Sequence, residues 1–255
     1  MENRYKGMKE NLVSIITPMY NSKGTISQAI ESVLNQSYKE WEMIIVDDCS
    51  CDGSIDIINV YAKKDNRIRY FIHKKNLGVA RTRNNAINQA KGRYLAFLDS
   101  DDIWKADKLE KQIGYMKEMQ AFFSYSACEI INKNGETIGK VRNVPEKTSY
   151  KKLLRGNVIP CLTVVLDRSK INKVEMPDIP HEDYATWLDI LKQGGIAHGI
   201  NEVLAEYRIS SDSVSGNKWR AMKWTWNIYR RHQELDFFKS SYYFICYVIT
   251  SLRKR

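Results

Sequence analysis

The stretch LVSIITPMYNSKGTISQAIESVLNQSYKEWEMIIVDD, residues 12–48, decides the fold class of this chain. One short aliphatic run opens it and a second closes it, and both are typical of strands buried in a parallel sheet. Between them, apolar residues recur at spacings of three and four, which predicts an amphipathic helix. We therefore expect a strand, a helix and a second strand, the repeating unit of a parallel sheet.

The same alternation continues as far as residue 99. Strand-like runs recur at residues 68–73 and 94–99, and helical patterns occupy residues 54–64 and 78–92. Right-handed crossovers between these elements would build a doubly wound, mostly parallel, Rossmann-like α/β sheet. Ligands of such sheets bind beyond the carboxyl ends of the strands, so the segments that follow the strands form the candidate site.

After residue 105 the pattern changes to that of a smaller, mixed lobe. Residues 121–141 indicate a hairpin that turns at Asn134 and Gly135, and residues 161–169 indicate a strand. Residues 181–194 have the apolar spacing of a helix, with Gly194 beyond its end. We divide the chain into three parts, residues 11–105, 106–216 and 217–255.

Composition and charge narrow the class of protein. Of the 255 residues, 43% are hydrophobic and 27% are charged, as in ordinary soluble enzymes. The five cysteines are scattered and odd in number, and the first residues lack an apolar signal region, so we expect a reduced, cytoplasmic chain. The net charge is +10, and nine basic residues against two acidic ones follow Gly216, so the tail carries most of it.

Three carboxylates crowd one predicted strand end. Asp99, Asp101 and Asp102 follow an apolar run, and only Ser100 separates them. Like charges repel and lose hydration beside a packed strand, so this cluster calls for a cation. A hard divalent ion with oxygen ligands is one interpretation, and a solvated loop in which Asp102 caps a helix starting near Trp104 is the other.

Six motifs in this chain resemble those of the bacterial family 2 glycosyltransferases and occur in that family's order. The resemblance extends over residues 13–218. The motifs are SIITPMYN (14–21), IIVDDCSCDGS (44–54), NLGVARTRNNAI (76–87), FLDSDD (97–102), HEDYATWLDILKQG (181–194) and AEYRISSDSVSGNKW (205–219). The resemblance implies a GT-A fold, with a nucleotide-sugar-binding half at 11–105, an acceptor half at 106–216 and basic C-terminal helices. It also implies an inverting enzyme of surface polysaccharide assembly.

The resemblance assigns a donor site to the strand ends. It implies that Asp101, with Asp99, binds Mn²⁺ or Mg²⁺, which holds the diphosphate of a nucleotide sugar. Asp99 and Ser100 are also expected at the sugar nucleotide. Asp48 corresponds to the residue that accepts a hydrogen bond from the uracil imide, which favours UDP sugars, although thymidine sugars fit the same pattern.

Four further residues receive roles from the same resemblance. Pro18 and Tyr20 correspond to the groups that lie against the base. Arg83 matches an arginine near the nucleotide, and a solvated helix face is the alternative for it. Arg208 is expected either to contact the diphosphate or to cap the fold. For Asp47 and Asp48, plain turn chemistry is the alternative.

The catalytic pair is expected at the start of the 181–194 helix. The resemblance implies that Asp183 takes the proton of the acceptor hydroxyl and that Glu182 contacts the acceptor or supports the acidic network. A helix N-terminus stabilises a carboxylate, which suits a general base, although an acidic first turn is also common in ordinary helices. Trp187 is expected either to stack on a sugar or to belong to the core.

One departure from the family pattern concerns the metal. A histidine often follows the family's YR, where it completes the metal site, and Ser210 stands about there in this chain. His181 or a water is the expected substitute.

The tail predicts a second kind of contact. Trp219, Met222, Trp226 and Tyr229 form one stripe, and residues 237–252 are apolar nearly all round but too short to span a bilayer. Basic and aromatic residues together favour binding to an anionic membrane surface, on the inner face of the cell membrane, where a lipid-linked saccharide would be the acceptor. The alternative is a helix pair packed on the catalytic lobe or on a second copy of the chain, in a homodimer.

Other functions fit the sequence less well. A nucleotide-sugar-binding protein with a degraded catalytic site is the nearest alternative. The basic tail would suit a nucleic-acid-binding protein, but no nucleic-acid fold signature occurs, so we expect no nucleic-acid partner. A sugar nucleotidyltransferase lacks its early glycine-rich phosphate loop here, and a dinucleotide oxidoreductase lacks its G-x-G-x-x-G.

Overall fold

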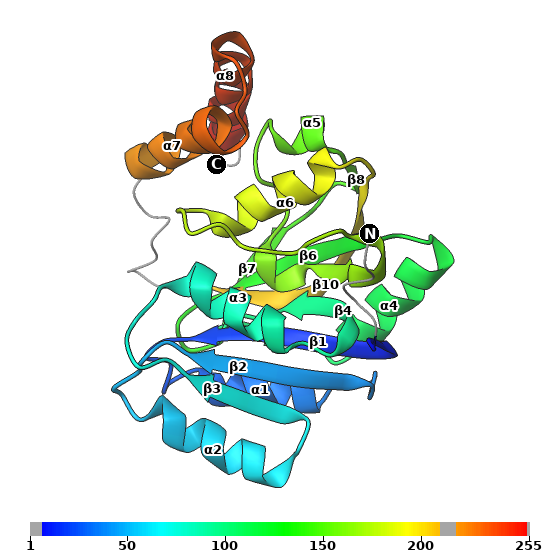
Figure 1. The fold of residues 1–255 in the computed structure, drawn as a ribbon, viewed down its shortest axis with the longest axis vertical. Coiled ribbons are helices and arrows are strands. Elements are labelled where there is room, and N and C mark those ends of the chain that lie inside the picture. The colour runs from blue at the N-terminus through cyan, green and yellow to red at the C-terminus, as the bar shows by residue number, and fades with distance from the viewer. Residues whose placement is uncertain (1–6, 210–217, 254–255) are drawn as a thin grey trace.

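A computed structural model describes residues 7–209 and 218–253 of the chain (Figure 1). Four parallel strands form the first half of its sheet in the order β3, β2, β1, β4. Their bounds are β1 (Lys9–Met19), β2 (Trp41–Asp47), β3 (Ile68–Ile72) and β4 (Gly92–Phe97). The predicted doubly wound arrangement is confirmed, since the helices α1 (Ile26–Leu34), α2 (Ser54–Lys64) and α3 (Val79–Gln89) connect these strands.

Both faces of this sheet are covered, which explains the aliphatic runs of its strands. Ile15 and Ile45 belong to one hydrophobic cluster, together with residues of α1, α2 and α4 (Lys108–Glu118). Their neighbours Ile16 and Ile44 belong to the other, with residues of α3 and α6 (Glu182–Lys192). Alternation along each strand thus places α3 and α6 on the same side of the sheet.

The second half extends the same sheet with mixed strands. The order continues from β4 through β9 and β6 to β10 and β5, and β9 is antiparallel to both of its neighbours. The bounds are β5 (Ile103–Trp104), β6 (Phe123–Ile131), β7 (Thr137–Arg142), β8 (Lys147–Thr148), β9 (Val165–Asp167) and β10 (Ala197–Arg208). The short helices are α5 (Tyr150–Leu153) and the 3₁₀ turns Cys161–Thr163 and Arg168–Lys170.

Two local predictions are confirmed here and one is wrong. β6 and β7 form the expected hairpin, and α6 occupies the expected helix with Gly194 beyond its end. Asp102 does not cap a helix, because Trp104 lies in a strand and the next helix begins at Lys108. Instead, the buried carboxylate of Asp102 accepts a hydrogen bond from the backbone N–H of Arg208.

The C-terminal helices lie against the second half of the fold (Figure 1). They comprise α7 (Lys218–Asn227), a π-helical turn (Ile228–His232) and α8 (Phe237–Arg253). The predicted stripe does not form one buried face, since Trp219 is 80% exposed whereas Tyr229 is fully buried. Of the helices in the part of the chain that is described, none is both long and apolar enough to cross a membrane.

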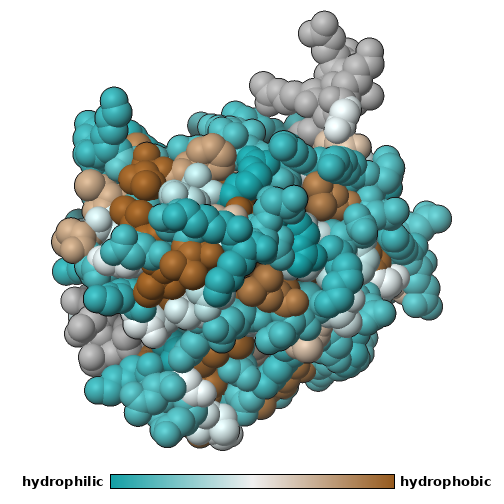
Figure 2. Space-filling model, turned by 90° about the horizontal axis from the view of Figure 1, so that it is seen from below, coloured by the Kyte–Doolittle hydropathy of each residue, from teal (hydrophilic) through white to brown (hydrophobic). Residues whose placement is uncertain are grey.

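The underside of the molecule, seen in Figure 2, is mostly hydrophilic, and its hydrophobic residues are interrupted by polar ones. This is the ordinary surface of a globular domain.

Candidate active site

Arg83 supplies a cation to part of the acidic cluster. It lies on α3 with only 5% of its surface exposed, and its Nη2 donates to Asp99 Oδ1 at 2.5 Å. Its Nη1 donates to a carboxylate oxygen of Glu182, on α6. Burial acts to lower the pKa of Arg83, but Asp99 and then Glu182 outweigh it and raise that pKa well above its ordinary value. Arg83 thus ties the end of β4 to the start of α6 as a permanent cation.

Asp101 has no such partner. Among the described residues, no side chain pairs with its carboxylate, which keeps an exposed surface. The protein packed around it, and then the charge of Asp99, raise the pKa of Asp101 to about 6. Of the two predicted metal ligands, Asp99 is therefore neutralised within the chain and Asp101 is left with uncompensated charge.

Arg208 holds in place the loop of residues 99–102, here called the acidic loop. Its Nε donates to the carbonyl of Asp101 at 2.6 Å, and its Nη2 donates to Gln28 Oε1 at 2.6 Å. Its Nη1 donates to the carbonyls of Asn132 and Lys133. These contacts provide the capping role that was one of its two predicted functions, and contact with the diphosphate stays a prediction.

The helix α6 places the catalytic candidates in its first turn, as predicted. Glu182 is its first residue and Asp183 its second, and both line one cavity with Asp99 and Arg83. Burial, followed by the charge of Asp183, raises the pKa of Glu182, while Arg83 opposes that rise. Asp183 forms no ion pair with any described residue, so its carboxylate lines the cavity without a cationic partner.

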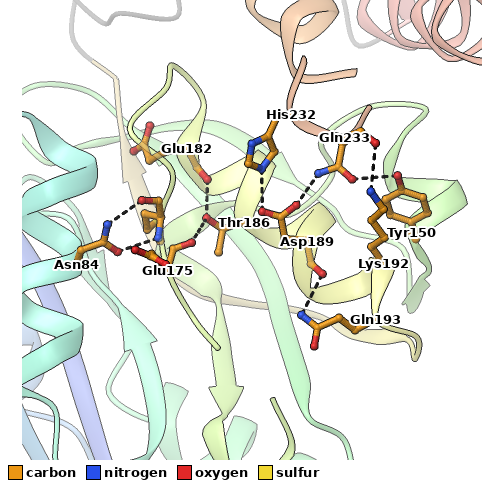
Figure 3. Close-up of polar contacts among 11 residues, drawn as sticks. Asn84, Tyr150, Glu175, Glu182, Thr186, Asp189, Lys192, Gln193, His232 and Gln233 are labelled. Atoms are coloured by element: carbon orange, nitrogen blue, oxygen red, sulfur yellow. Dashed lines mark hydrogen bonds and ion pairs between the residues drawn. The ribbon is translucent and has the colours of Figure 1, made fainter. Parts of the chain in front are cut away.

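Contacts at both ends fix α6 in place (Figure 3). Toward α3, the Asn84 side chain exchanges two hydrogen bonds with the backbone of Met176, in the segment before α6, and Thr186 Oγ1 on α6 donates to the carbonyl of Glu175 in that segment at 3.4 Å. Toward the tail, Asp189 accepts from Gln233 Nε2 at 2.6 Å and meets His232 Nε2 at 2.8 Å. The catalytic candidates are thus positioned by α3 and by the C-terminal π-helical turn.

The cavity has a volume of about 740 Å³ and is walled by both halves of the fold and by the tail. Four of the predicted site residues line it, namely Arg83, Asp99, Glu182 and Asp183. Pro18, Tyr20, Asp48, Ser100, Asp101 and Arg208 do not, and they lie at or beside the neighbouring strand ends. Trp187 is fully buried against Phe97 and Phe123, so it belongs to the core and not to a sugar site.

The residues predicted for the base lie at the carboxyl ends of β1 and β2. Pro18 is buried within β1, and Tyr20, directly after that strand, is 53% exposed. Asp48 accepts from His73 Nδ1 and from the N–H groups of Leu77 and Gly78, each at 2.8 Å. Burial acts to raise the pKa of Asp48, but these hydrogen bonds lower it below its ordinary value. Asp48 thus fixes the loop after β3, whereas the turn role is seen at Asp47, whose carboxylate accepts from the N–H of Ser50 at 3.0 Å. The contact of Asp48 with uracil stays a prediction.

Ser100 joins the acidic loop to the loop after β1. Its Oγ lies 2.7 Å from Ser22 Oγ, and both side chains are buried. Ser22 is fixed in turn because its N–H donates to Ser54 Oγ at 2.9 Å. The three strand-end loops are thus braced against one another, which would hold a donor site in shape.

The carboxylates fit a divalent cation only in part. In the stretches that the structure describes, no group of three or more histidine, cysteine or carboxylate side chains could hold a metal ion. His181 is therefore not placed to complete a site with Asp99 and Asp101, and its ring packs instead on Trp224 at 5.2 Å. Ser210 lies outside the described residues. Two carboxylates suit Mg²⁺ or Mn²⁺ only where phosphate oxygens and water provide the other ligands.

Several cavity residues were missed by the sequence predictions. Arg142, Asn157, Tyr207 and Trp224 line the cavity from the second half and the tail, and none belongs to a site assigned from the six motifs. Arg142 is the last residue of the second strand of the hairpin, and a lone basic residue at a strand end normally indicates only exposure to solvent. Trp224 lies two residues after Met222, on a face of the helix that the predicted stripe did not include.

The sequence profile described as Glycosyl transferase family 2 matches residues 14–172, more than half of the chain. This chain belongs to that family.

Two curated relatives match this glycosyltransferase over almost its whole length. It is 46% identical over 245 residues to TuaG of Bacillus subtilis, which is named as a teichuronic acid biosynthesis glycosyltransferase, covering 96% of this chain and 97% of that one. It is 41% identical over 248 residues to WfgD of Escherichia coli, covering 97% and 96%. WfgD is named as a UDP-Glc:alpha-D-GlcNAc-diphosphoundecaprenol beta-1,3-glucosyltransferase.

A solved structure confirms the fold of this glycosyltransferase. S. aureus TarS 1–349, in complex with UDP-GlcNAc, superposes with a TM-score of 0.72 at 19% identity, covering 92% of this chain and 71% of that one. The predicted GT-A fold, a mostly parallel mixed sheet followed by C-terminal helices, is confirmed by this likeness and by the topology described above.

Proposed function

We propose that this glycosyltransferase moves a sugar from a UDP sugar to a hydroxyl of a lipid-linked saccharide, with inversion at the anomeric carbon. The observation that carries the proposal is the separation of charges in the cavity: Asp99 lies at the end of β4, and Asp183 lies on α6 without a cationic partner. A donor at the strand ends would therefore present its sugar to a base on the opposite wall. The names of WfgD and TarS support UDP sugars and a diphosphate-linked acceptor.

The donor's diphosphate belongs at the acidic loop. Asp101, with Asp99, would hold Mn²⁺ or Mg²⁺, which when bound supplies positive charge to offset the charge of the leaving diphosphate. Arg83 and Arg208 keep the loop in position, since one binds Asp99 and the other binds the backbone of Asp101. Tyr20 offers an exposed aromatic face to the base, Pro18 lies two residues before it, and Asp48, directly after β2, lies at the same sheet edge.

Asp183 would act as the general base. The acceptor oxygen attacks the anomeric carbon from the side opposite the diphosphate, and its proton passes to the carboxylate of Asp183. The bond from the anomeric carbon to the diphosphate oxygen breaks, and UDP leaves with that electron pair. Glu182 cannot serve equally well, because Arg83 already pairs with it. Its role is to hold α6 against the donor side.

The tail would place the chain on an anionic membrane. Phe238, Tyr242, Ile245 and Ile249 follow one another on α8 at spacings of four, three and four, and each is between 45% and 84% exposed. Such a stripe on one face of a helix is typical of interfacial binding. Arg155 lies beside it, with Nη2 at 3.5 Å from the hydroxyl of Tyr242, and Lys239 adjoins Phe238. Arg155 and Lys239 would contact the lipid head groups, while the apolar stripe would enter the boundary between head groups and acyl chains.

A transfer assay tests the catalytic proposal. Purified protein, Mn²⁺ and UDP-glucose or UDP-GlcNAc are incubated with GlcNAc-diphosphate-lipid, and the product linkage is determined by NMR. We expect transfer with a β configuration from an α-linked donor. A product that retains the α configuration, or UDP-sugar-independent transfer, would overturn the proposal.

A vesicle assay tests the membrane proposal. We expect co-sedimentation with vesicles that contain phosphatidylglycerol and little with neutral vesicles, and we expect Ile245→Glu to abolish it. Val60→Glu, at an exposed apolar position on α2, is the matched control. If the intact chain binds neither kind of vesicle and Ile245→Glu converts a dimer to a monomer, the stripe contacts a second copy of the chain instead.

A further inference from the structure

A second cavity adjoins the first on the side of the C-terminal helices. It has a volume of about 310 Å³, and α8 contributes Tyr247, Thr250 and Ser251 to its wall. Five residues line both cavities, namely Arg142, Asn157, His181, Asp183 and Tyr207. Asp183 therefore faces the first cavity on one side and the space beneath α8 on the other.

The lining of the second cavity is rich in hydroxyl groups and contains one permanent cation. Among the described residues that line it, only Arg142 carries a guanidinium and only Asp183 a carboxylate. Arg142 forms no ion pair with any described carboxylate, and its Nη2 donates to the Asn157 carbonyl at a long 3.4 Å. Most of its five N–H donors are therefore available to a ligand.

A half-buried arginine without a carboxylate partner can bind an anion, and its planar fork matches the oxygens of a phosphate. The donor's diphosphate has its own place at the acidic loop, where Arg83 and Arg208 already make their contacts. Arg142 lines both cavities, and in the second one it lies with Asp183 and residues of α8, and without Asp99 or Arg83. The anion that it faces is therefore an anion of the acceptor.

We propose that the cavity beneath α8 is the acceptor subsite and that Arg142 binds the diphosphate that joins the acceptor sugar to its lipid. This inference rests on the proposed function, because it assumes that Asp183 is the base. The acceptor sugar lies at Asp183, its diphosphate on Arg142, and its lipid leaves along α8, whose outer face carries the apolar stripe of Phe238, Tyr242, Ile245 and Ile249. Because Arg142 lies in the same cavity as Asp183, the site selects diphosphate-linked acceptors over neutral ones.

Binding of two lipids that differ only in charge tests the inference. The intact chain is saturated with UDP and Mn²⁺, and farnesyl diphosphate or farnesol is titrated while tryptophan fluorescence and heat are recorded, since Trp224 lies at the first cavity. We expect the diphosphate to bind at least tenfold more tightly than the alcohol, and Arg142→Ala to remove that preference, as the loss of a charge-assisted contact implies. Arg142→Lys should keep part of it, and Lys64→Ala, an exposed cation on α2, should keep all of it.

Three outcomes would overturn the inference. They are equal binding of the two lipids by the intact chain, unchanged diphosphate binding by a folded Arg142→Ala variant, and a loss of UDP affinity in that variant without loss of lipid affinity. The last would assign Arg142 to the donor. Failure of the intact chain to bind UDP would instead overturn the proposed function, and the lipid titration without UDP would still decide whether Arg142 binds a diphosphate.

Discussion

Replacing Arg83 by methionine would remove the cation that lies between Asp99 and Glu182. Arg83 is 5% exposed and pairs with both carboxylates, whose side chains are 28% and 12% exposed. Breaking a buried ion pair by removing one partner costs about 3–5 kcal/mol, because the remaining charge is left uncompensated. In a chain of this size each kcal/mol lowers the melting temperature by roughly 2–4 °C, so we expect Arg83→Met to melt about 6–20 °C below the natural chain.

Calorimetry and denaturant unfolding measure this loss. Since Arg83→Met leaves two like charges, adding Glu182→Gln to it should recover part of the stability, and the double variant should melt above the single one. Arg81→Met is the control, because Arg81 pairs with Asp178 on the exposed surface, where ion pairs contribute at most about 1 kcal/mol. A fall of less than about 3 °C for Arg83→Met, or no recovery in the double variant, would refute the bridging role, since the lower bound above is about 6 °C.

Three further predictions follow from single residues. Asp183→Asn should bind UDP with unchanged affinity while transfer falls by about 10²–10⁴-fold, the usual contribution of a general base, and unchanged turnover would remove Asp183 from that role. Because the pKa of Asp101 is about 6, protons should compete with Mn²⁺ below that pH, so the Mn²⁺ affinity measured with UDP should fall as the pH drops from 7 to 5, and Asp101→Asn should bind weakly with a flatter profile. Burial lowers the pKa of Lys108 well below its ordinary value, so the unfolded chain binds more protons than the folded one, and stability should rise with pH toward 10 by up to about 1.4 kcal/mol per unit. Urea unfolding of Lys108→Met should lack that rise, and identical pH slopes for the two proteins would show that Lys108 stays charged when buried.

The first half of the fold could be predicted because its elements obey simple periodicities. Buried strands and amphipathic helices alternate from residue 12 to residue 99, and the strand ends then select the candidate loops. The position of Asp183 in the first turn of α6 was predicted for the same reason, since the acidic pair directly precedes a clear apolar spacing.

The counter-charges could not be predicted, because they depend on contacts between distant segments. Arg83 meets Glu182 across 99 positions, and Arg208 meets the loop of Asp101 across 107. Sequence spacing indicated a missing cation. It could not show that Arg83 neutralises Asp99 and that Asp101 remains without a cationic partner. A helix cap was one interpretation of Asp102, because acids often occupy caps. In the structure its carboxylate accepts a hydrogen bond from the backbone N–H of Arg208, on β10.

The cavity beneath α8 was beyond sequence reasoning for a different physical reason. Its walls come from a hairpin, an extended segment and two tail helices, each with ordinary side chains, and only packing brings Arg142 and Thr250 to Asp183. The tail pattern predicted a single stripe, but the two ends of that stripe lie in different surroundings. Tyr229 donates to the Leu154 carbonyl at 2.6 Å, while Trp219 remains in solvent.

Calorimetric titration of UDP, with Mn²⁺ and with a chelator, tests the donor site most directly. The described residues provide two carboxylates and no third metal ligand, so the diphosphate must complete the site, and metal and nucleotide should bind only together. We expect UDP to bind in the presence of Mn²⁺ and to lose most of its affinity in chelator, with GDP much weaker in both conditions. Equal UDP affinity with and without metal, or no binding of UDP at all, would contradict the assignment of Asp99 and Asp101 to a sugar-nucleotide site.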